Sequence, residues 1–240
     1  MKRMADLAWP EGVATVCAEG KQALGEALAK QVAAWLREAL AERGTAALAV
    51  SGGSTPVPFF QALARESLAW ENVSITLVDE RWVPETHDAS NARLLRELLL
   101  KGVAARAHFI PLVTKAASPQ EGQTEVEARL ATLPAFLDVV ILGMGADGHT
   151  ASLFPCTPGL AQALDPDGAA RCRAMSPPGA AQERITLTRS VIDAARHQVL
   201  HLTGDDKLAT LEQALASPDD ILSMPIRAFL HDGLTVYWSA

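Results

Sequence analysis

The sequence of 240 residues is short of the features that mark several specialised classes of protein. Its net charge of -7 leaves no excess of basic residues, so we expect no general nucleic-acid-binding surface. It has no apolar run long enough to cross a bilayer, and no apolar stretch follows the basic residues near its N-terminus, so we expect neither a membrane span nor a signal peptide. These absences predict a soluble protein of the cytoplasm.

Cysteine is scarce as well, and metal-binding and nucleophile motifs are missing. The three cysteines, Cys17, Cys156 and Cys172, have no metal-site spacing and cannot all pair, which is typical of free thiols in a reducing compartment. The six histidines form no H-E-x-x-H pair, and neither a P-loop ending nor a Gly-x-Ser-x-Gly elbow occurs. We therefore expect no metal and no cofactor, and we prefer water to a serine as the nucleophile of any hydrolysis.

The composition is that of a globular protein, with 49% apolar and 20% charged residues. Because repeats, low-complexity tracts and linkers are absent, residues 1–240 are predicted to form one domain. Segments with apolar residues at helical spacing alternate with short apolar runs typical of buried strands. Helices are predicted over residues 21–43, 57–64, 91–101, 124–133 and 206–216, and strands over residues 46–50, 73–78, 136–142, 184–188, 199–203 and 234–238.

This alternation predicts an α/β fold with a doubly wound, mostly parallel sheet and helices on both faces, similar to the Rossmann fold. In open α/β sheets, ligands bind beyond the carboxyl ends of the strands. Four polar clusters directly follow predicted strands, namely residues 51–55, 79–81, 143–149 and 204–207. We expect all four to meet at one edge of the sheet and to form the functional site there.

The segment Ser-Gly-Gly-Ser-Thr-Pro, residues 51–56, connects a predicted strand to a predicted helix. Gly52 and Gly53 expose backbone N–H groups, and Ser54 or Thr55 is placed to cap the helix. Because unpaired amides and the helix dipole then point the same way, such a loop favours an anion such as phosphate. A plain tight turn is an equally good interpretation of these residues alone.

The segment Asp79-Glu80-Arg81 places three charges directly after an apolar strand. Charges at that position are either paired with one another or directed at a ligand. Arg81 is the best ligand candidate because its planar guanidinium can hold a carboxylate, a phosphate or a developing oxyanion. A structural ion pair of Arg81 with Asp79 or Glu80 is the alternative.

The segment Asp147-Gly-His149 follows the most apolar predicted strand through a glycine-rich turn. Histidine titrates near neutral pH, so His149 can take a proton from water and return it to a leaving group, with Asp147 orienting the ring. The glycines of this segment also fit G-x-G-x-x-G, a dinucleotide signature. Against that interpretation, Pro155 falls too early for the long helix that the signature requires.

A further cation begins the last predicted helix. Lys207 lies in the first helical turn, where a positive charge opposes the helix dipole unless an anion binds there, and Asp205 or Asp206 is the expected cap. Lys207 is therefore a candidate phosphate ligand, although a solvated lysine offset by the two aspartates is the alternative. Arg184, at the start of Arg-Ile-Thr-Leu-Thr, is placed to add a second cation.

Taken together, these segments resemble the glucosamine-6-phosphate isomerase and 6-phosphogluconolactonase superfamily. The matching stretches occur in the order of that family and span residues 51–207. They are Ser-Gly-Gly-Ser-Thr-Pro, Asp-Glu-Arg-Trp-Val-Pro with Ser90-Asn91 after it, Leu-Gly-Met-Gly-Ala-Asp-Gly-His-Thr-Ala-Ser-Leu-Phe-Pro, Arg-Ile-Thr-Leu-Thr and Gly-x-x-Lys.

The resemblance is to the lactonase branch. The isomerase branch has Asp-Glu-Tyr where this chain has Asp79-Glu80-Arg81, and a glutamate that supports its histidine where alignment on Asp-Gly-His places Phe154. One difference remains, since lactonases often have Lys-Pro-Pro where this chain has Ser176-Pro177-Pro178, which leaves the set of phosphate ligands open.

The resemblance implies a fold of the sugar-phosphate isomerase type and hydrolysis of 6-phospho-D-glucono-1,5-lactone in the oxidative pentose phosphate pathway. It implies a monomer or small homo-oligomer whose partner is the small-molecule lactone. The expected catalytic residues are His149, Asp147 and Arg81, and the expected substrate- and phosphate-binding residues are Gly52, Gly53, Ser54, Thr55, Asp79, Arg184 and Lys207.

Two other functions remain as alternatives. The first is isomerisation and deamination of glucosamine 6-phosphate, against which Arg81 and Phe154 argue. The second is a non-catalytic sugar-phosphate sensor, which normally carries a DNA-binding module for which the roughly twenty residues before the first helix leave no room.

Overall fold

The computed structural model describes residues 4–240. The first three residues of the predicted domain 1–240, which also belong to the N-terminal stretch considered as a signal peptide, lie outside the described residues. Among residues 4–240, no helix is both long enough and apolar enough to cross a membrane.

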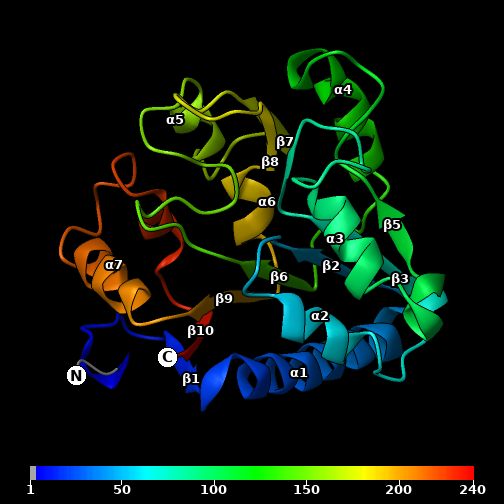
Figure 1. Cartoon of the computed structure of the whole chain (residues 1–240), viewed down its shortest axis with the longest axis horizontal. Coiled ribbons are helices and arrows are strands. Elements are labelled where there is room, and N and C mark those ends of the chain that lie inside the picture. Colours follow the sequence, from blue (N-terminus) through cyan, green and yellow to red (C-terminus); the bar gives the residue numbers. More distant parts are fainter. Residues whose placement is uncertain (1–3) are drawn as a thin grey trace.

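The secondary structure of residues 4–240 alternates strands and helices along most of the chain (Figure 1). The helices are α1 Gly20–Arg43, α2 Val57–Leu63, α3 Asn91–Leu98, α4 Pro119–Leu130, α5 Leu160–Ala163, α6 Arg189–Asp193 and α7 Asp206–Leu215. The strands are β1 Ala14–Cys17, β2 Ala46–Val50, β3 Val73–Leu77, β4 Asp79–Arg81, β5 His108–Ile110, β6 Val139–Leu142, β7 Cys172–Met175, β8 Arg184–Leu187, β9 His197–Thr203 and β10 Leu234–Ser239. Short 3-10 turns cover Met4–Asp6, Trp70–Asn72, Gly102–Arg106 and Pro225–Phe229.

Seven strands of the described chain form one parallel sheet in the order β1-β10-β9-β6-β2-β3-β5. From β2 the chain first adds β3 and β5 on one side, and then adds β6, β9 and β10 on the other. In Figure 1, α1 and α2 lie below this sheet, and α4, α5 and α6 lie above it. The predicted fold class, a doubly wound and mostly parallel sheet with helices on both faces, is confirmed.

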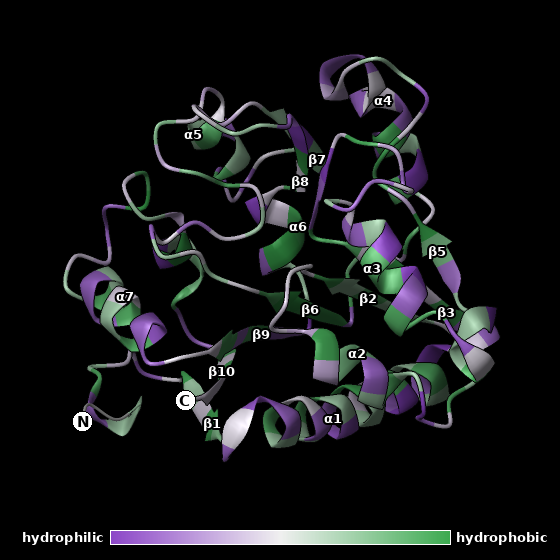
Figure 2. Cartoon of the chain, in the orientation of Figure 1, coloured by the Kyte–Doolittle hydropathy of each residue, from purple (hydrophilic) through white to green (hydrophobic). Residues whose placement is uncertain are grey.

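The central strands are apolar throughout because both faces of the sheet are covered. All five residues of β2 and all four of β6 are buried. Figure 2 shows these strands as hydrophobic, whereas the surrounding helices alternate between hydrophobic and hydrophilic residues. The sequence pattern of short apolar runs thus corresponds to the middle layer of the molecule.

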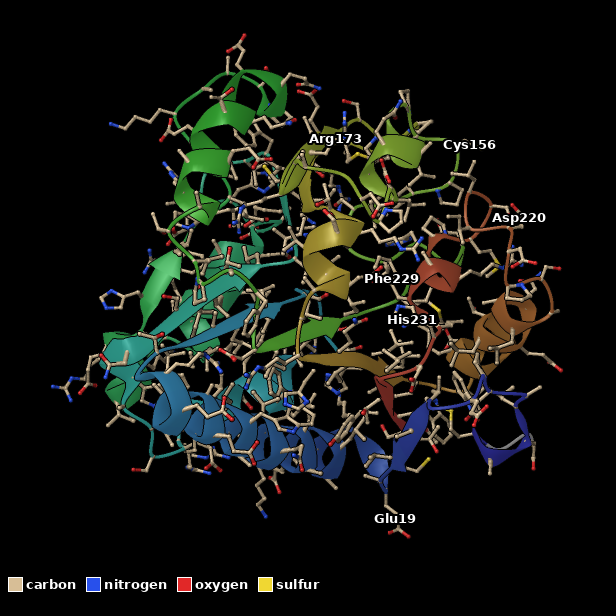
Figure 3. All side chains as sticks on the ribbon, turned by 180° about the vertical axis from the view of Figure 1, so that it is seen from behind. Glu19, Cys156, Arg173, Asp220, Phe229 and His231 are labelled. Carbon is tan, nitrogen blue, oxygen red and sulfur yellow. The ribbon has the colours of Figure 1, made fainter. Side chains whose placement is uncertain are left out.

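Helix α1 presents one apolar stripe to the sheet and one polar side to solvent. Leu24, Leu28, Val32 and Leu36 follow one another at helical spacing and are all completely buried. Gly44, in the left-handed conformation, ends the helix, as the sequence predicts. Figure 3, a view from behind, shows Glu19 pointing away from the molecule where this helix begins.

The sequence analysis missed a second sheet, in which β4, β8 and β7 pair antiparallel. The segment Asp79–Arg81, expected as a loop cluster after a strand, is itself the strand β4, and the predicted strand over residues 184–188 joins this small sheet rather than the parallel one. Strands β1, β5 and β7 and helices α5 and α6 were also not predicted. All of these elements have five residues or fewer, which is too short for a clear periodic pattern.

Three predicted boundaries differ by three residues and one by five. Helix α3 ends at Leu98 instead of residue 101, because the chain bends there and buries Leu99 completely. Strand β6 begins at Val139 instead of residue 136, because Phe136 lies under the guanidinium groups of Arg43 and Arg196 instead of joining the sheet. Helix α4 begins at Pro119 instead of residue 124, with Ser118 as its cap, and ends at Leu130 instead of residue 133.

Candidate active site

A cavity of about 360 Å³ opens at the carboxyl edge of the parallel sheet. It lies beyond the adjacent strands β3, β2, β6 and β9, and residues of all four polar clusters line it, so the expected meeting of the clusters at one edge is confirmed. Its volume suits a small organic ligand. Of the predicted site residues, the lining includes Gly52, Gly53, Ser54, Thr55, Asp79, Arg81, His149, Arg184 and Lys207.

Asp147 is the one predicted site residue that does not line the cavity, and it contacts His149 instead. Its Oδ1 lies 2.5 Å from Nδ1 of His149 and also accepts the backbone N–H of His149 at 3.1 Å. Burial alone raises the pKa of the Asp147 carboxyl, but these hydrogen bonds outweigh burial and lower it overall. An ionised carboxylate can only accept, so Nδ1 is the nitrogen that donates to Asp147, and Nε2 is the ring nitrogen outside this contact.

The loop that carries His149 is held at several points. Its own backbone closes on itself, since the amide of Gly145 donates to the carbonyl of His149 at 2.9 Å. The hydroxyl of Thr150 donates to the carbonyl of Gly143 at 2.8 Å, and the amide of Ile226 donates to the carbonyl of Gly148 at 2.9 Å. The imidazole therefore rests on a fixed loop and not on a free surface segment.

The glycines of the G-x-G-x-x-G pattern serve this loop and no dinucleotide site. A β-carbon on Gly145 would lie 2.1 Å from Cε1 of His149. Any other residue at position 145 would therefore collide with the imidazole in its present position. Gly148 adopts a φ of +76°, a conformation that favours glycine. A tight turn at residues 150–153 follows instead of a long helix, which agrees with the rejection of the dinucleotide interpretation.

Arg81 and Arg184 face each other across the small antiparallel sheet, where they are directly paired in register. Nη1 of Arg81 donates to the carbonyl of Ala89 at 2.6 Å, and Nη1 of Arg184 lies 4.0 Å from Oδ2 of Asp79. Within the described chain, the Nε of each arginine is buried without a partner. Burial lowers the pKa of the Arg184 guanidinium, an effect that Asp79 partly offsets and Arg81 reinforces.

The expected alternative, a structural pair of Arg81 with Asp79 or Glu80 through their side chains, is wrong for the described residues. Asp79, which is only 6% exposed, accepts a hydrogen bond from Oγ of Ser152 at 2.5 Å and approaches Arg184. Glu80 faces the start of α3 and accepts from backbone amides, that of Arg81 included. The guanidinium of Arg81 therefore pairs with neither carboxylate; it donates to the carbonyl of Ala89, and Arg81 lines the cavity.

The glycine loop after β2 is shaped by its neighbours. A β-carbon on Gly52 would lie 2.0 Å from Oδ1 of Asn91, so this position needs glycine for close approach. Gly53 has a φ of +96°, again a glycine conformation. The predicted cap is wrong, because Pro56 precedes α2 without a side-chain hydrogen bond and Thr55 instead lies with its Oγ1 3.2 Å from Oγ1 of Thr203.

Lys207 lies in the first turn of α7 and lines the cavity with a side chain that is 20% exposed. Its Nζ is 3.4 Å from Oδ2 of Asp206, so this carboxylate offsets part of its charge. Asp205 stands at the N-cap position of α7, as expected, but its side chain makes no capping hydrogen bond.

The sequence analysis missed several residues at the cavity. Asn91 was noted only as part of the matching stretch Ser90-Asn91, yet it lines the cavity and donates through Nδ2 to the carbonyl of Asp79. His201 also lines it, buried in β9 with both ring nitrogens unpartnered within the described chain. Ser152 and Phe154 do not line the cavity but contact the lining residues Asp79 and His149; Ser152 was not singled out, and Phe154 was used only to distinguish two family branches. Asn91, Ser152 and Phe154 lie within stretches that carry the resemblance, whereas His201 lies in none of them; the sequence assigned no site role to any of the four, and only the fold shows what they contact.

Phe154 is in direct contact with the predicted catalytic group. Its ring stacks on the imidazole of His149, with centroids 3.9 Å apart and planes inclined by 24°. The guanidinium carbon of Arg184 lies 5.3 Å from the centroid of the same ring. Within residues 4–240, no group of three or more histidine, cysteine or acidic side chains is arranged to hold a metal ion.

Comparison with known proteins gives one consistent family. The model of the family described as glucosamine-6-phosphate isomerases/6-phosphogluconolactonase matches residues 19–238. A 6-phosphogluconolactonase of Pseudomonas aeruginosa is 48% identical over 235 residues, which cover 98% of each chain. One from Rhizobium meliloti is 48% identical over 224 residues, 92% of this chain and 96% of the relative. The crystal structure of a 6-phosphogluconolactonase from Shewanella baltica superposes with a TM-score of 0.92 at 43% identity, covering 97% of this chain and all of the other.

Proposed function

The chain belongs to the glucosamine-6-phosphate isomerase/6-phosphogluconolactonase family, and we propose that it hydrolyses 6-phospho-D-glucono-1,5-lactone to 6-phosphogluconate. It is an enzyme that hydrolyses a lactone ester in sugar-phosphate metabolism, as its relatives of 48% identity over almost the whole chain indicate. The reaction it catalyses is the lactone-opening step of the oxidative pentose phosphate pathway.

The observation that carries the mechanism is the orientation of His149 at the cavity. Asp147 holds Nδ1 in its protonated form, so Nε2 is the basic nitrogen. In the proposed first step, Nε2 takes a proton from a water molecule as the water oxygen attacks the lactone carbonyl. In the second step, the carbon–oxygen bond of the ring breaks, and the imidazolium returns its proton to the departing ring oxygen.

Negative charge develops on the carbonyl oxygen during this attack. The buried guanidinium of Arg81, whose Nε has no partner within the described chain, is the proposed group that stabilises this oxyanion. A backbone amide of the surrounding loops is the alternative donor. Asp147 supports the positive charge that His149 acquires, and its proximity of 2.5 Å fits that role.

The phosphate group is proposed to bind at the other charged parts of the cavity. The backbone of Gly52, Gly53, Ser54 and Thr55 supplies amides, and Lys207 supplies a cation. Arg184 is the proposed second cation, and Asp79 keeps it in place from 4.0 Å. Anchoring the phosphate fixes the lactone carbonyl near His149. The energy of phosphate binding thereby offsets the entropy lost when the carbonyl is oriented for attack.

A coupled assay tests this function. Fresh 6-phosphogluconolactone is supplied to the enzyme and 6-phosphogluconate is measured, with glucosamine 6-phosphate run beside it. We expect turnover of the lactone and none of the amino sugar. The same assay with His149→Asn should show a fall in kcat of roughly a hundredfold or more, since a positioned general base contributes about that much. Near-normal turnover by this variant would remove His149 from the base role.

We also propose that the chain works as one domain, as a monomer or small homo-oligomer, in the cytoplasm. One continuous hydrophobic core joins residues from Met4 to Tyr237, which supports the single domain. Size-exclusion chromatography with light scattering tests the oligomeric state.

A further inference from the structure

One aromatic ring contacts two of the groups to which the proposed function assigns chemistry. Phe154 stacks on the imidazole of His149 at 3.9 Å, and Arg184 places its guanidinium carbon 5.3 Å from the centroid of the same ring. The base and an anion-binding cation are therefore joined by a side chain that has no proton to transfer and no charge.

A strained turn delivers Phe154 to this place. The chain reverses over residues 150–153, where Thr150 and Leu153 form a β-bridge and Ala151 adopts a φ of +50°, a conformation that is rare for residues other than glycine. The turn is held by Ser152, whose Oγ donates to Asp79 at 2.5 Å and whose backbone amide donates to Oγ1 of Thr186 at 3.3 Å. Strain that is retained under such anchoring points to a requirement of the site.

We propose that Phe154 is a positioning residue that fixes the plane of the His149 ring and its separation from the Arg184 guanidinium. The proposal rests on the proposed function. The hydrogen bond that Nδ1 donates to Asp147 fixes one atom of the imidazole but leaves the ring free to pivot about that contact. The stacked face of Phe154 removes this freedom. With the planes inclined by only 24° and the centroids 3.9 Å apart, the imidazole cannot pivot without colliding with the Phe154 ring.

The aromatic face also suits the charges of the reaction. His149 becomes an imidazolium during the proposed reaction, and Arg184 is a cation throughout. The face of an aromatic ring attracts positive charge. Phe154 therefore stabilises both the imidazolium of His149 and the guanidinium of Arg184 without adding a negative charge to the site. An aliphatic side chain of similar volume fills the space but offers neither a plane nor a ring face.

Three variants test the proposal. Phe154→Leu removes the ring, and Phe154→Tyr keeps it. Phe136→Leu is the matched control, since Phe136 is also partly buried and has a guanidinium carbon 5.2 Å from its centroid, but that guanidinium belongs to Arg196, which does not line the cavity. We expect Phe154→Leu to lower kcat by roughly tenfold to a hundredfold, as expected for a misplaced catalytic group, and to raise KM several-fold through Arg184. Phe154→Tyr should restore kcat, and Phe136→Leu should leave both constants unchanged.

A second measurement does not depend on turnover. In ¹⁵N-histidine-labelled protein, long-range ¹H–¹⁵N spectra show which ring nitrogen of His149 is protonated. We expect one protonated and one bare nitrogen in the unsubstituted protein and in Phe154→Tyr, and two averaged signals in Phe154→Leu, because a pivoting ring loses its single hydrogen-bonded form.

The outcomes separate the two proposals. Unsubstituted protein that does not hydrolyse the lactone overturns the proposed function, while the spectra still decide the role of Phe154. If Phe154→Leu keeps the spectrum of the unsubstituted protein, or changes kcat no more than Phe136→Leu does, Phe154 does not position His149.

Discussion

The imidazole of His149 lies so close to the backbone of Gly145 that the loop tolerates no side chain there. A β-carbon at this position would be 2.1 Å from Cε1 and 2.2 Å from Nδ1 of the ring. We therefore expect Gly145→Ala to displace the ring from Asp147 and to lower kcat by roughly a hundredfold, with little change in thermal stability.

Steady-state kinetics and a thermal melt check this expectation. Gly233→Ala is a comparison for backbone strain alone, because Gly233 does not line the cavity and a β-carbon there would meet no atom within 4 Å, while the φ of +88° makes the position strained but not crowded. Full activity in Gly145→Ala would mean that the reaction uses a different position of the His149 ring.

Lys207 provides a second test at the scale of the residue. Its ammonium lines the cavity and is partly offset by the carboxylate of Asp206 at 3.4 Å. If it binds the phosphate, Lys207→Ala should raise KM for the phosphorylated lactone by roughly tenfold to a hundredfold, the usual loss for a charged hydrogen bond, with a smaller effect on kcat. A non-phosphorylated gluconolactone serves as the control. An equal loss with both substrates would contradict the phosphate assignment.

At the scale of the element, the N-terminus of α3 is fixed by one buried carboxylate. Glu80, 1% exposed, accepts hydrogen bonds from the backbone amides of Arg81, Asn91 and Ala92 and from the hydroxyl of Ser90. Burial raises the pKa of this carboxyl, although the backbone amides act in the opposite direction. Through these bonds, Glu80 joins the small sheet to the helix that carries Asn91 into the cavity.

Glu80→Gln should therefore destabilise the protein by about 2 kcal/mol. The NH₂ group of glutamine would replace one carboxylate oxygen, and the groups that donate to that oxygen would lose their acceptor. Urea unfolding at pH 7 measures the change. Glu97→Gln, on the exposed side of the same helix and paired with Arg93 at 2.9 Å, is the matched control and should change stability by less than about 0.5 kcal/mol. Equal effects would show that the buried hydrogen bonds of Glu80 contribute nothing beyond an exposed charge.

At the scale of the whole molecule, the topology explains why distant segments share one cavity. The chain adds strands on one side of β2 and then on the other, so β2 and β6 are neighbours although nearly ninety residues separate them in sequence. Loops that follow them diverge in opposite directions, which opens a crevice at this point. The glycine loop and the loop of His149 lie on the two sides of that crevice.

Folding also makes the stability of the whole molecule depend on pH through buried histidines. Burial lowers the pKa of His201 from 6.5 to about 4. Because the folded pKa lies below the unfolded one, the folded state is favoured when His201 is neutral, and this contribution is lost as pH falls from about 6.5 to 4. His231, whose pKa is raised chiefly by its hydrogen bond to Asp193, contributes in the opposite sense as pH rises.

We expect His201→Leu to remove the part of the acid sensitivity that comes from this residue. A pKa difference of this size corresponds to roughly 3 kcal/mol. When the pH is lowered from 7 to 4, the unfolding free energy of the unsubstituted protein should therefore fall by about that much more than the unfolding free energy of the variant. Urea unfolding at several pH values measures it, and His231 cancels because it is present in both proteins. If the difference in unfolding free energy between the two proteins stays constant across this pH range, His201 is accessible to water in the folded protein.

The sequence by itself determined the layers of this protein and the edge of the sheet at which its candidate site residues meet. Long helices such as α1 show apolar residues at helical spacing, because one face of the helix is buried. Central strands such as β2 are apolar throughout, because both faces of the sheet are buried. The glycine loop, Arg81, His149 and Lys207 follow such elements, and the fold rule for parallel sheets places them at one edge. These residues were predictable because their type and their position both carry information.

Only the tertiary structure decided how these residues are held. The pairing of β4 with β8, which sets Arg81 opposite Arg184, joins strands about a hundred residues apart and too short to show a pattern. The stacking of Phe154 on His149 depends on a turn strained at Ala151 and anchored by Ser152. Local sequence cannot specify such contacts, because their energies arise between segments that only the folded chain brings together.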